Sequence, residues 1–424
     1  MFPRGTASLL ARFQANDFYR TDTRLPELAL EFATSPIANT GLYYTGETSV
    51  GIYEEKLGEI ERDRMLDDVE ELEAKLDGTI DPLDPDGNLP QRIRDLPMVE
   101  AESMLGDLRR RIENEPGFTR FDTYHQISMP KTLFGWLNVN PRAGIRATSY
   151  SDVDDYYDEE DGKRESVGSE TRVAAHAGLD ASFKVSKNYD RINLPRLGIN
   201  GVRHIAQPYI NYSFVASDKL DSRIGKIDRL TANTRLRPLD MSQFTAVDSI
   251  TDWNIIRAGV SERFQTKRDG AAYTWLEVNH FLEAYMDDPE FDRDFSNIYS
   301  QINFRPVPWI ALGIDAQLPL LADAPFDYTE YNTRISLMPT DRFEFTISHR
   351  YLQDHPLFED SNLLDLRAYY QVSDRWGVSA RQRYEFDDNT LEFQQYSVHY
   401  DLVSWTAALG AMIADNRSGE DEYG

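Results

Sequence analysis

Histidine carries out much of the proton transfer and metal binding that proteins perform near neutral pH, and this chain has seven histidines. They are scattered at positions 125, 176, 204, 280, 349, 355 and 399, with neither an H-E-x-x-H pattern nor the spacing of a zinc site. The chain has no cysteine, and it contains no G-x-S-x-G, G-x-x-x-x-G-K-[ST] or G-x-G-x-x-G motif. The sequence therefore predicts a protein that is not an enzyme and that uses no metal or cofactor.

Two groups of charged residues leave alternatives open. His176 and Asp180 fall on one side of an alternating segment, where they form either a catalytic dyad or, as we favour, part of a polar lining. The run at 152–161 holds seven acidic residues. It is either a solvated loop tip, which we favour, or a loose site for a divalent cation that bridges the loop to anionic lipid headgroups.

Charge and hydropathy limit the class of protein. The 424 residues include 45 Lys and Arg against 72 Asp and Glu, a formal net charge of -27, which argues against nucleic-acid binding. No run of about 18 apolar residues occurs, so no membrane-spanning helix is predicted. The first residues lack the basic and apolar regions of a secretory signal. A cytoplasmic protein and a fragment without its leader are both consistent with that start.

Apolar and polar residues alternate along most of the chain. Between Val173 and Val185 every second residue is apolar, while His176, Asp180 and Lys184 fall on the opposite side. Alternating segments of about 10 to 14 residues exceed the usual length of a soluble strand and match a tilted strand that crosses a membrane. The 23 tyrosines suit the aromatic girdles of such proteins. We therefore expect a large antiparallel transmembrane β-barrel, with a soluble β-sheet protein as the alternative.

Seventeen segments have the pattern of strands. They lie near 5–14, 24–33, 37–54, 119–129, 132–149, 171–187, 202–216, 254–267, 271–287, 293–304, 308–319, 326–338, 342–352, 361–373, 375–386, 389–401 and 404–414. Most links after even-numbered segments are short, and most links after odd-numbered ones are long and acidic. The exceptions are a long link at 188–201 and a short one at 387–388. Short turns on one side and long loops on the other are typical of outer-membrane barrels.

The longest link has a helical period instead. Apolar residues recur at helical spacing on either side of the breaker-rich stretch 81–90, at Leu57, Ile60, Leu66, Val69, Leu72 and Leu76 and at Met98, Ala101, Leu105, Leu108 and Ile112. This predicts an acidic helical hairpin, either a lid packed on itself, which we favour, or a docking surface for a partner. The expected organisation is barrel strands at 1–54, this insertion at 55–118, further strands at 119–414 and a loop-like tail at 415–424.

Three stretches carry a resemblance to a known family. They are DFYRTDTRLPELALEF at 17–32 with GLYYTGETSVGIYEE at 41–55, VRHIAQPYINYSF at 202–214, and, more weakly, the loop LRPLDMSQFTAVDSI at 236–250. Together they resemble the LPS-assembly outer-membrane barrel proteins of Gram-negative bacteria, the organic-solvent-tolerance family. The resemblance covers about half the chain and includes no catalytic motif.

The resemblance implies a function in the bacterial outer membrane. Members of the family form a very large barrel, plugged by an outer-membrane lipoprotein, that receives lipopolysaccharide from a periplasmic transport bridge and releases it into the outer leaflet. Acyl chains leave through a lateral opening between the first and last strands, while the sugars use the polar lumen. The family's periplasmic jelly-roll domain and its cysteines have no counterpart here, so the resemblance implies roughly the C-terminal two-thirds of a barrel.

Polar members of neighbouring alternating strands are expected to line the lumen. They are Arg142, Arg146, His176, Asp180, Lys184, Arg203, Gln207 and Asn211. A general or substrate-specific porin is the main alternative function, because rows that contain Arg142, Arg146, Arg381 and Arg383 suit the charged eyelet of a channel. An outer-membrane enzyme is a further alternative.

The last strand leads to a prediction about the end of the barrel. Bacterial single-chain barrels have an even number of strands. A seventeenth strand at 404–414 that runs outward, followed by an acidic tail, therefore predicts an odd strand number and an open seam with unpaired edges. It also predicts that Gly424 lies on the long-loop side.

Overall fold

The computed structural model describes residues 5–76, 98–158, 163–231, 233–289, 293–320, 328–415 and 421–423. Antiparallel strands dominate, with 20 strands in one sheet and a separate two-stranded hairpin. The expected fold class is confirmed, because the chain is all-β and its sheet is of the kind that forms large outer-membrane barrels. The chain divides into two compact units, the first comprising 1–130, 141–178 and 213–252 and the second comprising 131–140, 179–212 and 253–424.

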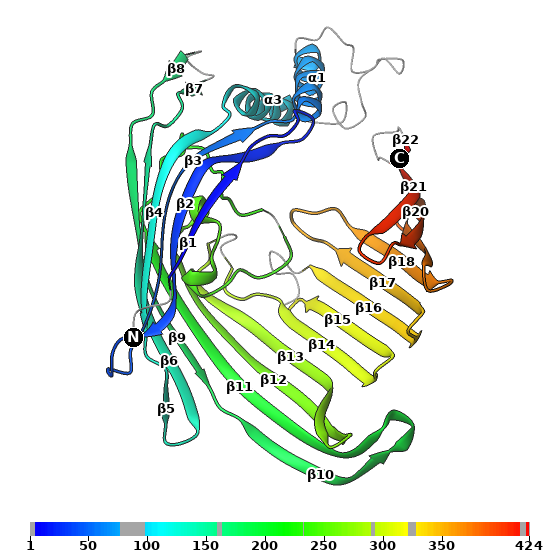
Figure 1. Ribbon diagram of the computed structural model, residues 1–424. Coiled ribbons are helices and arrows are strands. Elements are labelled where there is room, and N and C mark those ends of the chain that lie inside the picture. The colour runs from blue at the N-terminus through cyan, green and yellow to red at the C-terminus, as the bar shows by residue number, and fades with distance from the viewer. Residues whose placement is uncertain are drawn as a thin grey trace. The chain divides into compact units, whose positions relative to one another are not determined.

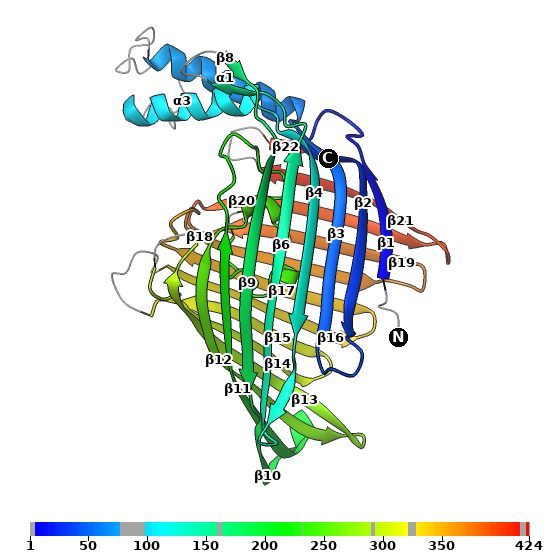
Figure 2. The same ribbon diagram turned by 90° about the vertical axis from the view of Figure 1, so that its left-hand side faces the viewer.

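The first unit is built on consecutive antiparallel strands that Figure 2 shows side by side. Its strands are β1 (Gly5–Arg12), β2 (Thr21–Pro36), β3 (Tyr43–Lys56) and β4 (Gly117–Ser128), with most of β6 (Leu137–Ser151) and β9 (Glu170–Ser182). Two helices, α1 (Glu59–Leu76) and α3 (Met98–Glu113), separate β3 from β4, and the hairpin β7 (Tyr156–Asp158) and β8 (Lys163–Glu165) follows β6. Two short 3-10 helices, η2 (Met241–Gln243) and η3 (Val247–Ser249), lie in the segment 218–252.

The second unit continues the same up-and-down pattern, as Figure 1 shows for β12 to β17. Its longer strands are β11 (Ile199–Ser217, which ends in the first unit), β12 (Trp253–Arg268), β13 (Ala271–Asp287), β14 (Ile298–Val307), β15 (Ile310–Leu318), β16 (Thr329–Thr340), β17 (Phe343–Gln353), β18 (Ser361–Gln371), β19 (Trp376–Glu385), β20 (Thr390–Asp401) and β21 (Thr406–Asp415). It also contains β5 (Lys131–Leu133), β10 (Val185–Leu194), η1 (Pro195–Leu197) and β22 (Asp421–Tyr423).

The predicted strands are confirmed in the described residues. Each of the seventeen segments overlaps one long strand, and the sheet reaches 20 strands through β5, β10 and β22. Two segments extend into a second strand, because 132–149 includes part of β5 and 171–187 includes the start of β10. The stretch 188–201, expected to be a long link, instead forms a hairpin in which β10 pairs with β11. Short turns also occur where expected. Arg268 pairs with Ala271 across Asp269 and Gly270, whose φ angles of 50° and 81° suit the two-residue turn that matches the twist of a hairpin.

The exposure of side chains on the two faces of the sheet is the reverse of that in a soluble protein, because apolar side chains are exposed and charged ones are buried. In β4, Phe121 and Ile127 are 45% and 46% exposed, whereas Arg120 and Asp122 on the other face are 3% and 2% exposed. Four of the six tryptophans, at 136, 309, 376 and 405, are exposed at or beside short turns. Such a belt marks the level of a membrane interface. In the described part of the chain, neither helix is long and apolar enough to cross a membrane.

The two helices form the predicted hairpin and pack on each other, as Figure 2 shows. Leu72 and Leu108 belong to a buried cluster that α1 and α3 build between them. Three of the apolar residues at helical spacing are exposed instead, because Ile60, Leu66 and Met98 are 46%, 47% and 48% exposed. Met65, next to Leu66, is buried in the cluster. The stretch 81–90 lies outside the described residues.

The first and last long strands belong to different units. β1 pairs with β2 in the first unit, and β21 pairs with β20 in the second. The open seam therefore stays a prediction. Gly424 lies outside the residues that the structure describes, as do positions 159–162 of the acidic run.

Candidate functional site

The polar face of the first unit is covered by the chain itself. Residues 218–252, which connect β11 to β12 and are called the capping segment from here on, contribute Ile227, Phe244 and Val247 to a cavity whose other side is formed by β2, β3, β4 and β6. This cavity measures about 660 Å³. Its wall contains both arginines and carboxylates, so it is polar but close to balanced in charge.

Asp248 is the main attachment point of the capping segment. Its side chain is 1% exposed, and its Oδ1 accepts hydrogen bonds from Arg120 Nη1 at 2.9 Å and from the Tyr150 hydroxyl at 2.7 Å. Its Oδ2 accepts from the backbone N–H groups of Ile227 and Asp228 at 3.1 and 2.8 Å. One carboxylate thus joins β4 and β6 to two separate turns of the segment. A buried carboxylate with four donors is stable only while those donors remain in place.

Asp228 extends the attachment toward β2. Its two carboxylate oxygens accept from Arg120 Nη2 at 2.5 Å and from Arg24 Nη2 at 2.7 Å. Arg24 also binds Glu27 at 2.9 Å, so the two aspartates and the two arginines alternate in one network. At the exposed start of the segment, hydrogen bonds from Arg223 lower the pKa of Asp221.

The predicted lining residues of the first unit lie under this segment. Arg146 binds Asp122 through Nε and Nη2, the latter at 2.7 Å, and donates to the Phe244 carbonyl at 3.3 Å. Arg142 lies 3.7 Å from Asp240 of the segment. The ring of His176 stacks on Tyr124, with centroids 5.5 Å apart. These three side chains are buried beneath the capping segment and do not form an open wall.

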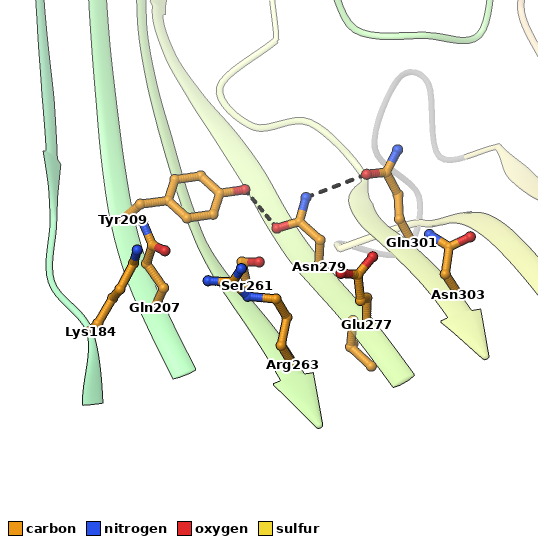
Figure 3. Close-up of a pocket in the computed structure, with 10 residues that line it drawn as sticks. Lys184, Gln207, Tyr209, Ser261, Arg263, Glu277, Asn279, Gln301 and Asn303 are labelled. Carbon is orange, nitrogen blue, oxygen red and sulfur yellow. Dashed lines mark hydrogen bonds between the residues drawn. The ribbon is translucent and has the colours of Figure 1, made fainter. Parts of the chain in front are cut away.

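The polar face of the second unit surrounds a second cavity, of about 680 Å³ (Figure 3). Three uncharged side chains form a chain of hydrogen bonds across it, from the Tyr209 hydroxyl to Asn279 at 3.0 Å and from Asn279 to Gln301 at 3.4 Å. Charged groups are also present, because Arg263 and Glu277 line the same space. The cavity therefore offers donors and acceptors from four strands, most of them neutral.

A glycine makes room for the tyrosine of this cavity. A Cβ on Gly259 of β12 would come within 2.6 Å of the Tyr209 ring and 2.7 Å of the His280 carbonyl oxygen. Because real Cβ atoms do not approach other atoms so closely, any larger residue at 259 must displace the ring or the neighbouring strand. Gly259 thus permits the position of Tyr209 that Figure 3 shows.

The other predicted lining residues belong to the second unit. Lys184 and Gln207 line the cavity, and Gln207 donates to Ser182 at 3.3 Å. Asn211 donates to Asp180 at 2.6 Å. Arg203 is exposed on the same side of β11 as Gln207. Most of the residues that line the cavity were not among the predicted ones, namely Tyr209, Ser261, Arg263, Glu277, Asn279, Gln301 and Asn303. Alternation in β12 to β14 was a signal that could have identified them.

The arginine rows that suited a porin eyelet lie beside carboxylates among the described residues. Arg142 and Arg146 have the carboxylate partners described above. Arg381 and Arg383 both bind Asp365, at 2.6 and 3.3 Å, but Asp365 also binds Arg367, so three arginines share one carboxylate. In addition, no group of three or more metal-binding side chains occurs among the described residues. The walls can form hydrogen bonds through their neutral polar side chains and ion pairs through their charged ones.

The sequence as a whole matches a known family. A model of LPS transport system D, LptD, matches residues 10–411. The chain therefore belongs to the LptD family. As a family member with a sheet of the outer-membrane barrel kind, it is a protein of the bacterial outer membrane.

No sequence of a curated protein matches this LptD-family chain. Among solved structures, the FpvA receptor of P. aeruginosa bound to heterologous pyoverdines is similar with 9% identity and a TM-score of 0.35, over 99% of this chain and 59% of that one. A mutant of the ferric enterobactin receptor PfeA from Pseudomonas aeruginosa has 8% identity and a TM-score of 0.39, over 99% and 71%. The FrpB iron transporter from Neisseria meningitidis has 7% identity and a TM-score of 0.39, over 95% and 63%. The chain spans 59% of the length of the first of these receptors.

Proposed function

We propose that this chain transports lipopolysaccharide through the outer membrane and assembles it into the outer leaflet. The observation that carries the proposal is the family match over 10–411, which includes both polar walls. In this proposal the sugars and phosphates of the substrate move along the polar faces, and the acyl chains stay in the apolar phase. The step is physical, without covalent catalysis.

The second cavity suits the sugar part of such a substrate. Tyr209, Asn279 and Gln301 present hydroxyl and amide groups that exchange hydrogen bonds with a passing sugar without the desolvation cost of a buried charge. Lys184 and Arg263 supply positive charge for phosphate groups. We further propose that the chain works with an outer-membrane lipoprotein plug and a periplasmic transport bridge, as the family resemblance implies.

The test uses cells in which the native gene is replaced by a variant with Asn279→Leu and Gln301→Leu. Each lost hydrogen bond is worth about 0.5 to 1.5 kcal/mol, so we expect surface lipopolysaccharide to appear up to about tenfold more slowly. Pulse labelling of lipopolysaccharide on intact cells measures this rate. Heat-modifiable migration and the amount of barrel in the membrane show that assembly is unchanged.

A matched control places the same substitutions outside the cavity, as Asn138→Leu and Gln371→Leu at short-turn ends of β6 and β18. This variant should transport at the normal rate. Equal rates for the cavity variant and the control would contradict the role of the cavity. Steady, porin-like conductance steps of the purified protein in a planar bilayer, with normal lipopolysaccharide export after gene depletion, would favour the porin alternative.

A further inference from the structure

Strand β10 is an edge that the sheet leaves open. It pairs with β11 from Val185 opposite Ala206 to Leu194 opposite Ile199, and all ten of its residues are exposed. Its second edge has no partner strand among the residues that the structure describes. In an antiparallel pair, every second residue of an edge strand points its N–H and C=O away from the ladder. About five residues of β10 therefore present free backbone groups.

The position of β10 places this edge in water. Phe183, just before β10, packs edge-on against Trp136 of the exposed tryptophan belt, with ring centroids 5.4 Å apart. Unpaired backbone groups are not tolerated in the hydrocarbon region, so β10 must lie beyond that belt. It lies on the short-turn side, which faces the periplasm in bacterial outer-membrane barrels.

The charge of this hairpin is opposite to that of the chain. Residues 184–203 contain five Lys or Arg and a single acidic residue, Asp190, while the whole chain has a net charge of -27. All five cations, Lys184, Lys187, Arg191, Arg196 and Arg203, are exposed, and none has an ion-pair partner among the described residues. The arginines of the polar walls differ, because most of them are bound to carboxylates.

Exposed apolar side chains occur on both faces of β10. Val185 and Tyr189 are 53% and 39% exposed, with Lys187 between them and its Nζ 5.2 Å from the centre of the Tyr189 ring. Ile192 and Leu194 near the tip are 40% and 49% exposed. A flat membrane surface contacts one face of a strand. A strand added to the edge brings side chains beside both faces.

We propose that β10 docks an extended, acidic segment of a periplasmic protein, which adds to the free edge as an antiparallel or parallel strand. The backbone supplies the pairing, the exposed cations select acidic side chains, and the apolar residues on both faces cover those of the added strand. A second copy of this hairpin is an unsuitable partner, because its own cations repel those of the first. This proposal concerns a partner surface and stands independently of the transported substrate.

The experiment measures binding of a fluorescein-labelled ten-residue peptide, alternating Val and Thr with three Glu, to the full chain in detergent micelles. Two isomers of the peptide carry N-methyl groups on alternate residues, one on the odd set and one on the even set. The unmodified peptide should bind. One isomer should bind about as well and the other should lose binding, because only one edge of the added strand pairs with β10.

Charge reversal tests the cations. Lys187→Glu with Arg191→Glu should weaken binding of the unmodified peptide by about tenfold or more. The matched control, Arg342→Glu with Arg375→Glu, changes two other exposed arginines near short turns and should leave the affinity unchanged. Heat-modifiable migration confirms that both variants are folded.

Three results would overturn the proposal. Equal binding of both methylated isomers would show attraction by charge alone. Binding of phosphatidylglycerol vesicles without binding of the peptide would assign the hairpin to a lipid surface. No binding of either probe would show that Lys187 and its neighbours only keep the edge from pairing, a role that charged residues have in other edge strands.

Discussion

The two polar walls of this protein follow the same alternation but are completed differently. In the first unit, the capping segment covers the wall, and Asp248 and Asp228 bind arginines from β2 and β4. In the second unit, Tyr209, Asn279 and Gln301 leave a cavity that is mostly neutral. A polar inward face thus has two uses. Paired charged side chains hold a loop in place, whereas amides and hydroxyls form a surface on which a ligand can exchange hydrogen bonds.

The largest expected effect comes from breaking the attachment in the first unit. Asp248→Asn removes one of the two carboxylate charges that bind Arg120 and disturbs the acceptor of two backbone N–H groups. Loss of one partner of a buried ion pair costs about 3 to 5 kcal/mol. We expect the capping segment to detach and trypsin to cut at Lys219, Arg223 or Lys226 much faster than in the unchanged protein. Limited proteolysis with mass spectrometry measures the rates.

The control for this variant is Asp221→Asn in the same segment. Asp221 binds the exposed Arg223, and exposed ion pairs are worth about 0 to 1 kcal/mol. Trypsin should therefore cut this control slowly, as it cuts the unchanged protein. Equal protection of the Asp248 variant would mean that the buried network does not hold the segment.

A smaller effect is expected from the cavity of the second unit. Gly259→Ala places a Cβ within 2.6 Å of the Tyr209 ring, and overpacking of this kind costs about 1 to 3 kcal/mol. The thermal unfolding midpoint in detergent should fall, and the change should be absent for Gly313→Ala, where the nearest atom is 3.9 Å from the added Cβ. Equal midpoints for the two variants would contradict the close packing of Tyr209.

The smallest effect is expected in the loop between β17 and β18 of the second unit, which is held by hydrogen bonds to the uncharged ring of His355. His355 Nδ1 accepts from the backbone N–H groups of Leu357 and Phe358 at 3.1 and 3.2 Å, and burial lowers the pKa of His355. The opened loop therefore binds a proton more readily, so its closed form is favoured above the ordinary pKa of histidine, about 6.5, and loses stability as the pH falls below it.

Hydrogen exchange measures this pH dependence. We expect the protection factors of the Leu357 and Phe358 amides to fall about two- to threefold between pH 7 and pH 5. His355→Asn keeps an acceptor that does not titrate, and its protection factors should stay constant over the same range. A decrease of the same size in this variant would assign the pH dependence to another group.

Much of the fold could be predicted from alternation, because each strand must present one face to lipid and the other to the interior. Segment lengths located the strands, and Gly and Pro located most short turns. The stretch 188–201 was wrongly expected to be a long link, since the pairing of β10 with β11 depends on a register between segments. The helical spacing predicted α1 and α3, but the choice between Met65 and Leu66 depended on how the helices meet.

The candidate site was predicted only in part. Parity places Lys184 and Gln207 on the side that lines the second cavity, because side chains of a strand alternate with a period of two. Their partners could not be predicted in this way. Asp248 lies 128 residues from Arg120, and Asn279 lies 70 residues from Tyr209.

The sequence by itself determined the strand periodicity, the parity of turns and loops, the excess of acidic residues and the membership of the LptD family. Only the tertiary structure decided which arginines pair with carboxylates, which segment covers a wall and where an edge stays open. The reason is physical. Periodicity is a local property that backbone geometry imposes on neighbouring residues, whereas a hydrogen bond or an ion pair acts over about 3 to 4 Å between groups that only the folded chain brings together.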